Sequence, residues 1–424
     1  MTLTAMPKYE AYRDSGEEWI AEIPEHWTVQ KLKHIFQEKK HTQNMSLTCG
    51  AISFGQVIEK GDEKVTEATK KSYQEVLSGE FLINPLNLNY DLISLRIALS
   101  TINVVVSAGY IVLKNKISIN KDYFKYLLHR YDVAYMKLLG SGVRQTISFN
   151  HIANSLLVIP PINEQTAIAN FLDTKTTQID EAIAIKEQQI ALLNERKQIL
   201  IQQAVTQGLD PTVPMKDSGV EWIGKIPEHW EVRRSKFVFC QRKERARPAD
   251  IQLSATQAYG VIPQEQYEEM IGRKVVKISF HLEKRKHVEI DDFVISMRSF
   301  QGGLERAWAS GCIRSSYVVL QPVNKKEIDA GFFSYMLKLP KYINALQMTA
   351  SFIRDGQDLN FDNFAQVDLF IPPIEEQKLI FSEIQFKVDE INKSIAIFMG
   401  QITKYQEYKT TLINSAVTGK IKVV

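Results

Sequence analysis

Two long stretches of the chain carry apolar residues at helical spacing, and each begins directly after a Pro-Pro pair. Residues 163–207 contain neither proline nor glycine, and the second stretch, after Pro373, contains only Gly400 before Val417. Proline is accommodated in the first turn of a helix but breaks its interior, so each stretch is predicted to form one long helix. The apolar positions recur 212 residues apart, with Ile168, Leu172, Ile179, Ile183, Ile190, Leu193, Leu200 and Ala204 matching Ile380, Ile384, Ile391, Ile395, Ile402, Tyr405, Leu412 and Ala416.

The apolar positions of each stretch form a seam that needs a partner. Ile168, Ile179 and Ile190 are eleven residues apart, a repeat that gives a nearly straight or slightly right-handed pair of helices. A helix of roughly 44 residues spans about 66 Å at about 1.5 Å per residue. An amphipathic helix that lies on its own globular domain is the alternative. The length favours an intramolecular antiparallel pair, in which the two matching seams cover each other.

The segments outside these stretches have the pattern of an α+β fold. Short β-branched and aromatic runs, such as 101–106 and 110–113, are separated by turn residues. Helical segments are predicted near 122–139 and 330–348. The stretch 208–214, Gly-Leu-Asp-Pro-Thr-Val-Pro, ends the first long helix and serves as a linker.

The chain contains the same motifs twice, in the same order. Ser-Gly-x-Glu-Trp-Ile-x-x-Ile-Pro-Glu-His-Trp occupies 15–27 and returns at 218–230, and Ile-Pro-Pro-Ile-x-Glu-Gln occupies 159–165 and returns at 371–377. A tandem duplication explains this order. We therefore predict an α+β fold with two globular domains separated by a long antiparallel pair of helices, related as a pseudo-two-fold repeat. The predicted boundaries are 1–161 for the first globular domain, 162–207 for the first helix, 208–373 for the second globular domain and 374–424 for the second helix.

The sequences between the repeated motifs match poorly. Only strand-like traces correspond, 81–84 with 293–296 and 110–113 with 317–320. The two halves therefore share their repeated motifs but differ in the sequences between them. This is the pattern expected when one scaffold carries two different recognition surfaces.

Composition indicates a globular protein of two or three domains. Of the 424 residues, 44% are hydrophobic and 24% are charged, enough for real hydrophobic cores. The formal net charge of +3 does not by itself indicate a nucleic-acid-binding protein, so such a surface would have to come from local clustering. The widely spaced cysteines, the lack of a signal-peptide pattern and the lack of a long apolar run predict a soluble, cytoplasmic protein with no membrane contact.

The sequence lacks the motifs of an enzyme. No GxxxxGK(S/T) phosphate loop occurs, and the eight histidines have no metal-binding spacing such as HExxH. Asn-Pro-Leu-Asn at 84–87 is only superficially similar to the amino-methyltransferase motif, because it lacks the second proline and the aromatic residue that stacks on a flipped base. His26 and His229 each precede a tryptophan inside a repeated motif, and we interpret them as parts of structural turns. A non-catalytic protein is predicted.

The duplicated motifs resemble those of the specificity subunit of type I restriction–modification systems, and the resemblance covers essentially the whole chain. It implies that each globular half is a target-recognition domain that reads one part of a split DNA sequence. It also implies that the helices bind two methyltransferase subunits and that two restriction–translocase subunits can join, for phage defence. S-adenosylmethionine, ATP and Mg would belong to those partners, and this chain would bind no cofactor. Because the two halves differ, the double-stranded DNA target should be asymmetric and bipartite.

Specific base contacts need Arg, Asn, Gln or Lys side chains aimed at base edges. The segment 297–303, Met-Arg-Ser-Phe-Gln-Gly-Gly, resembles a family loop that leads to the recognition surface, and 85–89 is its counterpart in the first half. Three further arginines, one in the first half and two in the second, lie near later predicted strands and are weaker candidates. A polar turn, or a surface salt bridge such as Arg354 with Asp355, is the alternative. The candidates are Asn87, Asn89, Arg144, Arg298, Gln301, Arg314 and Arg354.

A dense basic run in the second half is the candidate phosphate-binding segment. Residues 233–247 carry seven cations and a single carboxylate, Glu244. Clustered cations are sufficient for contact with the DNA backbone, whereas a solvated surface face is the ordinary alternative. A sparser group of lysines occupies 31–40 in the first half. The predicted phosphate contacts are Arg242, Lys243, Arg245 and Arg247.

Two rival functions stay open on the sequence alone. A non-catalytic helical-rod scaffold that binds proteins through two globular modules would show the same duplication, and the low net charge favours it. A catalytic DNA methyltransferase or nuclease is the second rival, and the missing motifs argue against it. Arg, Asn and Gln residues in loops favour DNA recognition over both.

Overall fold

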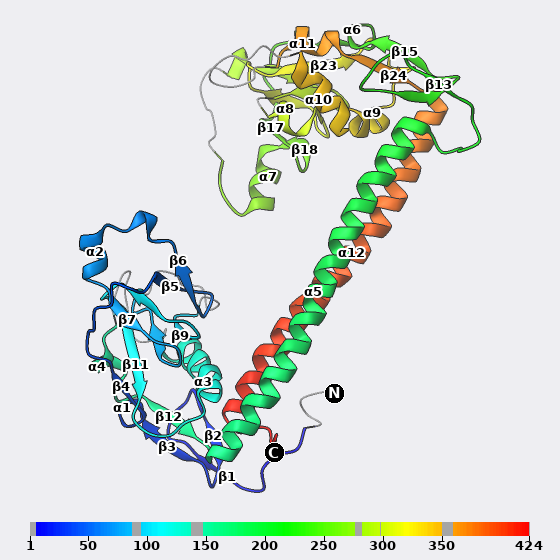
Figure 1. Cartoon of the computed structure of the whole chain (residues 1–424). Coiled ribbons are helices and arrows are strands. Elements are labelled where there is room, and N and C mark those ends of the chain that lie inside the picture. Colours follow the sequence, from blue (N-terminus) through cyan, green and yellow to red (C-terminus); the bar gives the residue numbers. More distant parts are fainter. Residues whose placement is uncertain are drawn as a thin grey trace. The chain divides into compact units, whose positions relative to one another are not determined.

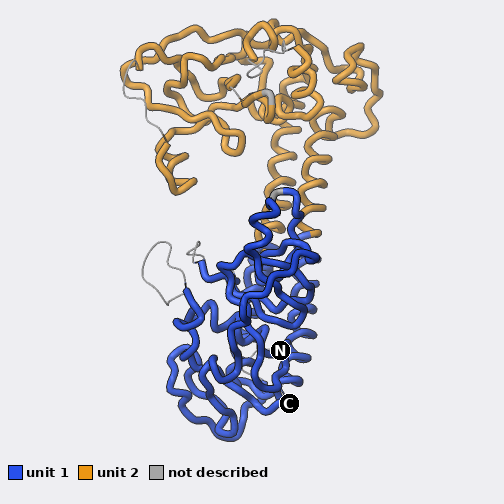
Figure 2. Tube along the Cα trace, turned by 60° about the vertical axis from the view of Figure 1, so that its left-hand side comes forward, with its two compact units in different colours: residues 1–187, 398–424 blue, residues 188–397 orange. Residues whose placement is uncertain are grey.

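The computed structural model describes residues 6–86, 95–136, 147–275, 282–296, 298–349 and 359–423. The chain forms two compact units, unit 1 made of Met1–Glu187 with Phe398–Val424, and unit 2 made of Gln188–Ile397 (Figure 2). The division passes through two long helices, α5 (Ile162–Gln207) and α12 (Ile374–Val417), so each unit holds the first part of one and the last part of the other. No described helix has a stretch long and apolar enough to cross a membrane.

The two long helices predicted from the apolar pattern are confirmed, with 46 and 44 residues (Figure 1). Every predicted seam position is at least partly buried. Within unit 1 the helix segments run antiparallel, because Lys409 pairs with Asp180 at 2.6 Å while the earlier Phe398 lies under the ammonium of the later Lys186 at 4.6 Å. The α+β fold with a long antiparallel helix pair is therefore as predicted.

Unit 1 contains two four-stranded sheets, in the spatial orders β4-β11-β8-β9 and β6-β5-β10-β7, and the two-stranded sheets β1-β2 and β3-β12. The first four-stranded sheet is antiparallel throughout, whereas β10 pairs with β5 in parallel. The strands of unit 1 are β1 (Tyr12–Asp14), β2 (Glu22–Pro24), β3 (Thr28–Lys31), β4 (Phe36–Glu38), β5 (Cys49–Ser53), β6 (Gln56–Lys60), β7 (Gln74–Val76), β8 (Phe81–Ile83), β9 (Ile97–Leu99), β10 (Val104–Val106), β11 (Ile111–Asn115) and β12 (Leu156–Ile159). Its shorter helices are α1 (Leu32–Ile35), α2 (Glu67–Lys71), α3 (Lys121–Ala134) and α4 (Phe149–Ile152), with a 3-10 turn at Asp62–Lys64.

Unit 2 contains one four-stranded antiparallel sheet, β16-β23-β20-β21, and the pairs β13-β14, β15-β24, β17-β18 and β19-β22. Its strands are β13 (Met215–Asp217), β14 (Lys225–Pro227), β15 (Glu231–Arg234), β16 (Phe239–Gln241), β17 (Leu253–Thr256), β18 (Gly260–Pro263), β19 (Lys286–Val288), β20 (Phe293–Ile295), β21 (Glu305–Arg306), β22 (Gly311–Ile313), β23 (Val318–Pro322) and β24 (Asp368–Ile371). Its shorter helices are α6 (Ser235–Val238), α7 (Gln264–Ile271), α8 (Ser299–Gly302), α9 (Ala330–Met336), α10 (Pro340–Met348) and α11 (Phe361–Gln366), with a 3-10 turn at Leu282–Lys284.

The duplication extends to the register of the sheets. Phe81 and Ile83 of β8 pair with Leu113 and Ile111 of β11. In unit 2, β20 and β23 pair in the same way, Phe293 with Leu320 and Ile295 with Val318. These are the strand-like traces that correspond between the two halves of the sequence. The surrounding hairpins correspond as well, because a parallel bridge between Gln252 and Cys312 connects the β17-β18 hairpin to β22, as β5 pairs in parallel with β10 in unit 1.

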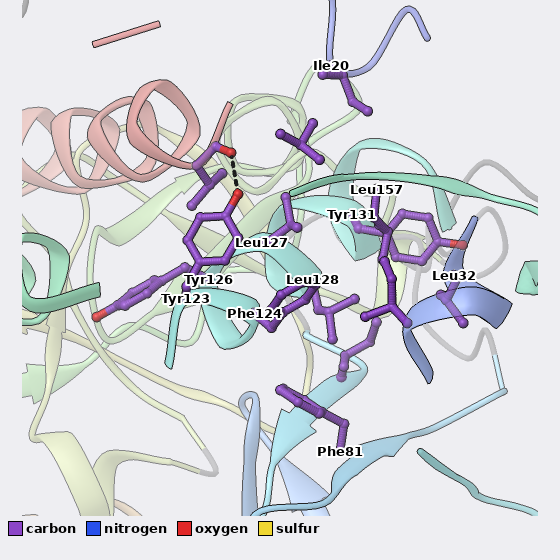
Figure 3. Close-up of a cluster of buried hydrophobic side chains, with 14 of the residues drawn as sticks. Ile20, Leu32, Phe81, Tyr123, Phe124, Tyr126, Leu127, Leu128, Tyr131 and Leu157 are labelled. Carbon is purple, nitrogen blue, oxygen red and sulfur yellow. Dashed lines mark hydrogen bonds between the residues drawn. The ribbon is translucent and has the colours of Figure 1, made fainter. Parts of the chain in front are cut away.

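The core of unit 1 is built around α3 (Figure 3). Tyr123, Phe124 and Tyr131 are fully buried, and Tyr123 Oη donates a hydrogen bond of 3.0 Å to the carbonyl oxygen of Val417 on α12. Large apolar side chains gain about 1.5–3 kcal/mol each on full burial, so the long helices stabilise the unit they enter. Their contribution to this core is Ile168, Ala169, Leu172, Ile179, Leu412, Ala416 and Val417.

The core of unit 2 follows the same plan. The ring of Phe239 on β16 lies 5.6 Å from that of Phe293 and 5.3 Å from that of Phe333, in edge-on contacts. Ile380 and Ile384, from the first part of α12, are fully buried in this core. Edge-on pairs add roughly 0.5–1.5 kcal/mol to the burial of the rings.

The helix predicted near 330–348 is in fact two helices, α9 and α10. Pro340 is the first residue of α10, because proline has no amide proton to donate and its ring collides with the preceding turn of a helix. The prediction of one continuous helix was wrong for this reason. The helix predicted near 122–139 corresponds to α3, and residues 137–139 lie outside the described part of the chain.

Candidate nucleic-acid interface

The repeated motifs contact each other inside each unit. In unit 1, Glu164 at the start of α5 accepts hydrogen bonds from Trp27 Nε1 at 3.0 Å and Tyr9 Oη at 2.8 Å, and its other oxygen lies 2.7 Å from His26 Nε2. Burial raises the pKa of Glu164, but these hydrogen bonds outweigh burial and the pKa is lowered. The carboxylate therefore stays ionised and ties the first motif to the long helix.

Unit 2 repeats this arrangement with the second copy of both motifs. Glu376 accepts a hydrogen bond of 3.1 Å from Trp230 Nε1 and lies 2.7 Å from His229 Nε2. The neighbouring Gln377 donates to the carbonyl oxygen of Pro372 at 2.8 Å and accepts from the amide of Asp329 at 2.8 Å. The contacts of both histidines are those of the structural turns that we inferred from the sequence. The repeated motifs therefore explain how the long helices dock on each unit.

One groove of unit 2 gathers three predicted base contacts. Arg298 and Gln301 from the segment of α8, and Arg314 after β22, line a groove of about 870 Å³. The β17-β18 hairpin, α7 and α8 contribute its walls (Figure 1). Residues sixteen positions apart in the sequence thus lie around one hollow, and all three side chains are exposed.

The groove also contains residues that the sequence had not marked. Arg273 follows α7, and Arg285 precedes β19. Two tyrosines, Tyr259 of the hairpin turn and Tyr267 of α7, stand with ring centroids 6.4 Å apart. None of these four residues belongs to the basic runs 31–40 and 233–247 or to a repeated motif. The available signal was the turn Gln-Ala-Tyr-Gly at 257–260 between two β-branched runs, which is typical of a hairpin.

The charge of the groove is of one sign. Four arginines line it, and no aspartate or glutamate is among the described residues that do so. In the described part of the chain, the side chains of Arg273, Arg298, Gln301 and Arg314 make no hydrogen bond or ion pair. Arg285 is mostly buried, and its guanidinium interacts with the thiol of Cys312. Unpaired guanidinium and amide groups beside aromatic rings are suited to an anionic, base-bearing ligand.

A tight turn presents Arg298 and Gln301. Ser296 follows β20, and its amide donates to the hydroxyl of the buried Ser299 at 2.8 Å. Arg298 occupies the position before α8, where its carbonyl oxygen accepts from the amides of Gln301 at 2.9 Å and Gly302 at 3.2 Å. The backbone of the turn is therefore fully engaged while the two long polar side chains remain free.

The dense basic run has a different environment. Arg242 pairs with Asp292 through two hydrogen bonds of 2.6 and 3.0 Å, with side chains only 11% and 2% exposed. Arg247 pairs with Glu244 at 2.7 Å and with Glu289 at 3.0 Å. Counting a single carboxylate within the run was misleading, because folding brings Asp292 and Glu289 from another part of the chain to these cations. Their contacts favour the structural alternative over phosphate binding.

Lys243 and Arg245, between these two arginines, are exposed. Among the described residues, the guanidinium of Arg245 donates to the carbonyl oxygen of Lys284 alone, at 3.2 Å, so most of it is available. In unit 1, the lysine group contains one clear counterpart of Arg242, since Lys39 is 6% exposed and pairs with Glu75 and Glu80 at 2.9 Å each. Four further candidates, Asn87, Asn89, Arg144 and Arg354, lie outside the described residues.

Comparison with known proteins gives one consistent result. The family model for the type I restriction modification DNA specificity domain matches the chain twice, at residues 24–195 and 227–397. The putative type I restriction enzyme MjaX specificity subunit of Methanocaldococcus jannaschii is 24% identical over 440 residues, covering 95% of this chain and 96% of that protein. The MjaVIII specificity subunit of the same organism is 23% identical over 346 residues, 75% of each chain.

Solved structures are similar in fold. A chain from a study of complex assembly and conformational transition of the type I R-M system has a TM-score of 0.66 at 13% identity, covering 93% of this chain and 98% of that one. The HsdS subunit of Thermoanaerobacter tengcongensis has a TM-score of 0.52 at 14% identity, covering 94% and 98%. At these identities the likeness concerns the fold.

Proposed function

The chain belongs to the type I restriction modification DNA specificity family, and on this premise we propose that it selects the DNA sequence on which a type I restriction–modification complex acts. Each unit reads one part of a bipartite target. The target is asymmetric, because the two halves of the chain carry different residues between their shared motifs. The chain is the non-catalytic recognition subunit of that complex.

The groove of unit 2 is the observation that carries this proposal. Its arginines face no carboxylate among the described lining residues, so they repel one another unless an anion enters. Arg and Gln are the side chains that read guanine and adenine through paired hydrogen bonds, each pair contributing about 1–3 kcal/mol of discrimination. Arg298, Gln301 and Arg314 are therefore assigned to base contacts in this half of the target.

The scaffold alternative requires a protein-binding surface on the globular modules. A groove with four arginines and no acidic residue among its described lining is suited to a polyanion rather than to an average protein surface. Exposed apolar residues do occur on the long helices. In unit 2, Leu192 and Ile199 of α5 are seven residues apart, as are Leu379 and Phe386 of α12, and all four are exposed.

We assign these exposed helix residues to the partner subunits. A seven-residue spacing places Leu192 and Ile199 on one helical face, which a partner helix can cover. Two methyltransferase subunits, one for each half of the duplicated chain, and two restriction–translocase subunits complete the complex. S-adenosylmethionine, ATP and Mg belong to those subunits. Among the described residues, no group of His, Cys, Asp or Glu is arranged to hold a metal ion.

The domain boundaries follow from the same proposal. The target-recognition domains are residues 1–161 and 208–373, and the segments that bind methyltransferase subunits are 162–207 and 374–424. Asn87, Asn89 and Arg144 belong to the first recognition domain, and Arg354 to the second. The cytoplasm is the compartment in which such a complex meets DNA.

Co-expression of the chain with its methyltransferase subunit, followed by genome-wide mapping of methylated bases, tests the proposal. We expect methylation at one bipartite sequence with two dissimilar halves. A gel-shift assay with duplexes of that sequence should then show specific binding by the complex. Methylation without sequence preference, or a complex that binds the methyltransferase subunit and no DNA, would contradict it.

A further inference from the structure

The turn that presents Arg298 is held by two other connections of unit 2. Gln257, in the turn of the β17-β18 hairpin, donates from Nε2 to the carbonyl oxygen of Arg298 at 3.1 Å. Lys338, between α9 and α10, donates from Nζ to the carbonyl oxygen of Gln257 at 3.1 Å. The same ammonium pairs with Glu305 of β21 at 2.7 Å. Glu305, Lys338, Gln257 and Arg298, which come from four separate segments, are thus linked by successive polar contacts that end at Arg298.

The segments are closely packed at Gly302 and Gly303. A Cβ atom added to Gly302 would lie 2.6 Å from Gln257 Nε2. At Gly303 the backbone is left-handed, with φ of +80°, and an added Cβ would overlap the carbonyl oxygen of Leu337. The turn of α8 is therefore packed between the hairpin turn and the segment before α10. A four-residue helix has little stability of its own, so these neighbours determine where it lies.

Glu305 fixes the other end of this series of contacts. Its side chain is 2% exposed, and its second oxygen has no hydrogen-bond partner. Burial raises the pKa of this carboxyl group despite the nearby Lys338. A buried carboxylate is costly unless a cation accompanies it, so the ammonium of Lys338 has one favourable position, beside Glu305 and under the hairpin turn.

We propose that Lys338 is a positioning residue for DNA readout. Glu305 holds its ammonium, the ammonium holds the hairpin turn at Gln257, and Gln257 holds the backbone that carries Arg298 and Gln301. Lys338 is not part of the groove lining, so it acts through Gln257 rather than by touching DNA. Base recognition requires placement within about 0.5 Å, which an unsupported surface turn does not provide. The proposal rests on the proposed function, because it concerns the same groove.

The test compares four variants of the full chain, each assembled with its methyltransferase subunits. Lys338→Met removes the hydrogen bond to Gln257, but it also leaves the buried carboxylate of Glu305 without its cation. The double variant Glu305→Gln with Lys338→Met is therefore made as well. Lys338→Arg retains a donor. Lys341→Met is the matched control, since Lys341 is an exposed lysine of α10 with no hydrogen bond or ion pair in the described part of the chain. Binding is measured on duplexes that carry the mapped target or single-base changes in either half.

The double variant should fold as the natural chain does and lose roughly fivefold in discrimination, the lower end of one paired base contact. The loss should fall only on the half-target in which Arg298→Ala loses discrimination, and binding to unrelated DNA should not change. Lys338→Arg should retain most of the discrimination, and Lys341→Met all of it. Unchanged discrimination in the double variant, or equal losses in both halves, would overturn the role of Lys338. If the natural complex prefers no sequence, or Arg298→Ala has no effect, the proposed function itself fails.

Discussion

Two arginine-bearing regions of unit 2 differ in their spacing along the sequence and in the neighbours that the fold gives them. The run at 233–247 is dense in cations, yet Arg242 and Arg247 are held by carboxylates from other segments. The groove takes its arginines singly, from four separate places in the sequence, and the side chains of three of them have no partner in the described part of the chain. The density of cations along the chain thus does not indicate how many are free to bind an anion.

The difference follows from which neighbours the fold supplies. Asp292 precedes β20, which β23 separates from β16 in the sheet, and its carboxylate meets the guanidinium of Arg242, which follows β16. The loops around the groove bring together arginine, glutamine and tyrosine without a carboxylate among the described lining residues. A buried pair contributes to folding, whereas an exposed unpaired cation contributes to binding. Variants of the two regions should therefore have separable effects.

The largest effect should come from Arg242→Ala. The substitution leaves Asp292 buried without its cation, which costs about 3–5 kcal/mol for a buried pair. Urea unfolding of the full chain, followed by tryptophan fluorescence, should show this loss of stability. Lys243→Ala, one residue away and exposed, is the control and should change stability by less than about 0.5 kcal/mol. A stable Arg242→Ala protein with weakened DNA binding would reverse the comparison.

Arg298→Ala should have the second largest effect, on recognition rather than on stability. Its side chain makes no contact that folding needs, so unfolding should be unchanged. Loss of one paired base contact should reduce discrimination by about 1–3 kcal/mol at one or two positions of one half-target. Competition binding with single-base variants of the mapped target measures this. Uniform loss over all sequences would show that Arg298 contacts phosphate and does not read a base.

The sequence was sufficient to predict the frame of the molecule. Motifs that recur in the same order contact each other, as Trp27 does with Glu164 and Trp230 with Glu376. The duplication in the sequence therefore indicated both the long helices and the way they dock. Local rules also explain the error at Pro340, whose position at a helix start was visible in the sequence. The periodicity of apolar residues and the placement of proline are local properties, so they can be read from a single sequence.

The groove could be predicted only in part. Arg298 and Gln301 were found because their segment follows a strand and resembles a loop of the family, and Arg314 was a weaker candidate before the next strand. The sequence could not indicate that Arg273, Arg285 and the hairpin turn also line the groove. No local feature shows that α7 and β19 lie beside the same groove. The pairing of Arg242 with Asp292 spans fifty residues and was hidden for the same reason. Long-range pairing of charges depends on tertiary structure, which spacing along one chain does not report.

A smaller effect is expected from Lys243 and Arg245, the exposed cations of the basic run. If they contact phosphates, the double variant Lys243→Ala with Arg245→Ala should weaken binding equally for cognate and unrelated DNA. The slope of log affinity against log salt should fall by about 0.9 for each contact removed. A salt titration from low to moderate ionic strength measures this slope. An unchanged slope would remove the basic run from the interface altogether and leave the groove as the DNA-binding part of unit 2.

The smallest effect should be a pH dependence of stability from His287, which joins the charge network of the basic run. The ring is fully buried, with Nδ1 2.8 Å from Asp250 and Nε2 2.9 Å from Glu289. Burial lowers the pKa of His287, but the two carboxylates outweigh burial and raise it above the ordinary value of 6.5. A pKa raised by folding means that the protonated ring stabilises the folded chain fully below about pH 6.5, and that this contribution disappears as the pH rises through the folded-state value.

Urea midpoints measured from pH 6 to pH 9 should therefore fall more steeply for the natural chain than for His287→Gln, which cannot titrate. Glu289 also pairs with Arg247, so losing the imidazolium leaves that carboxylate still neutralised on one side, which keeps the effect small. DNA discrimination by the groove should not follow this pH dependence, because His287 does not line it. A natural chain that becomes more stable than His287→Gln as the pH rises would show that the ring is neutral in the folded state. The neutral ring would then add no charge to this network, and Arg242 and Arg247 would be the cations that hold its carboxylates.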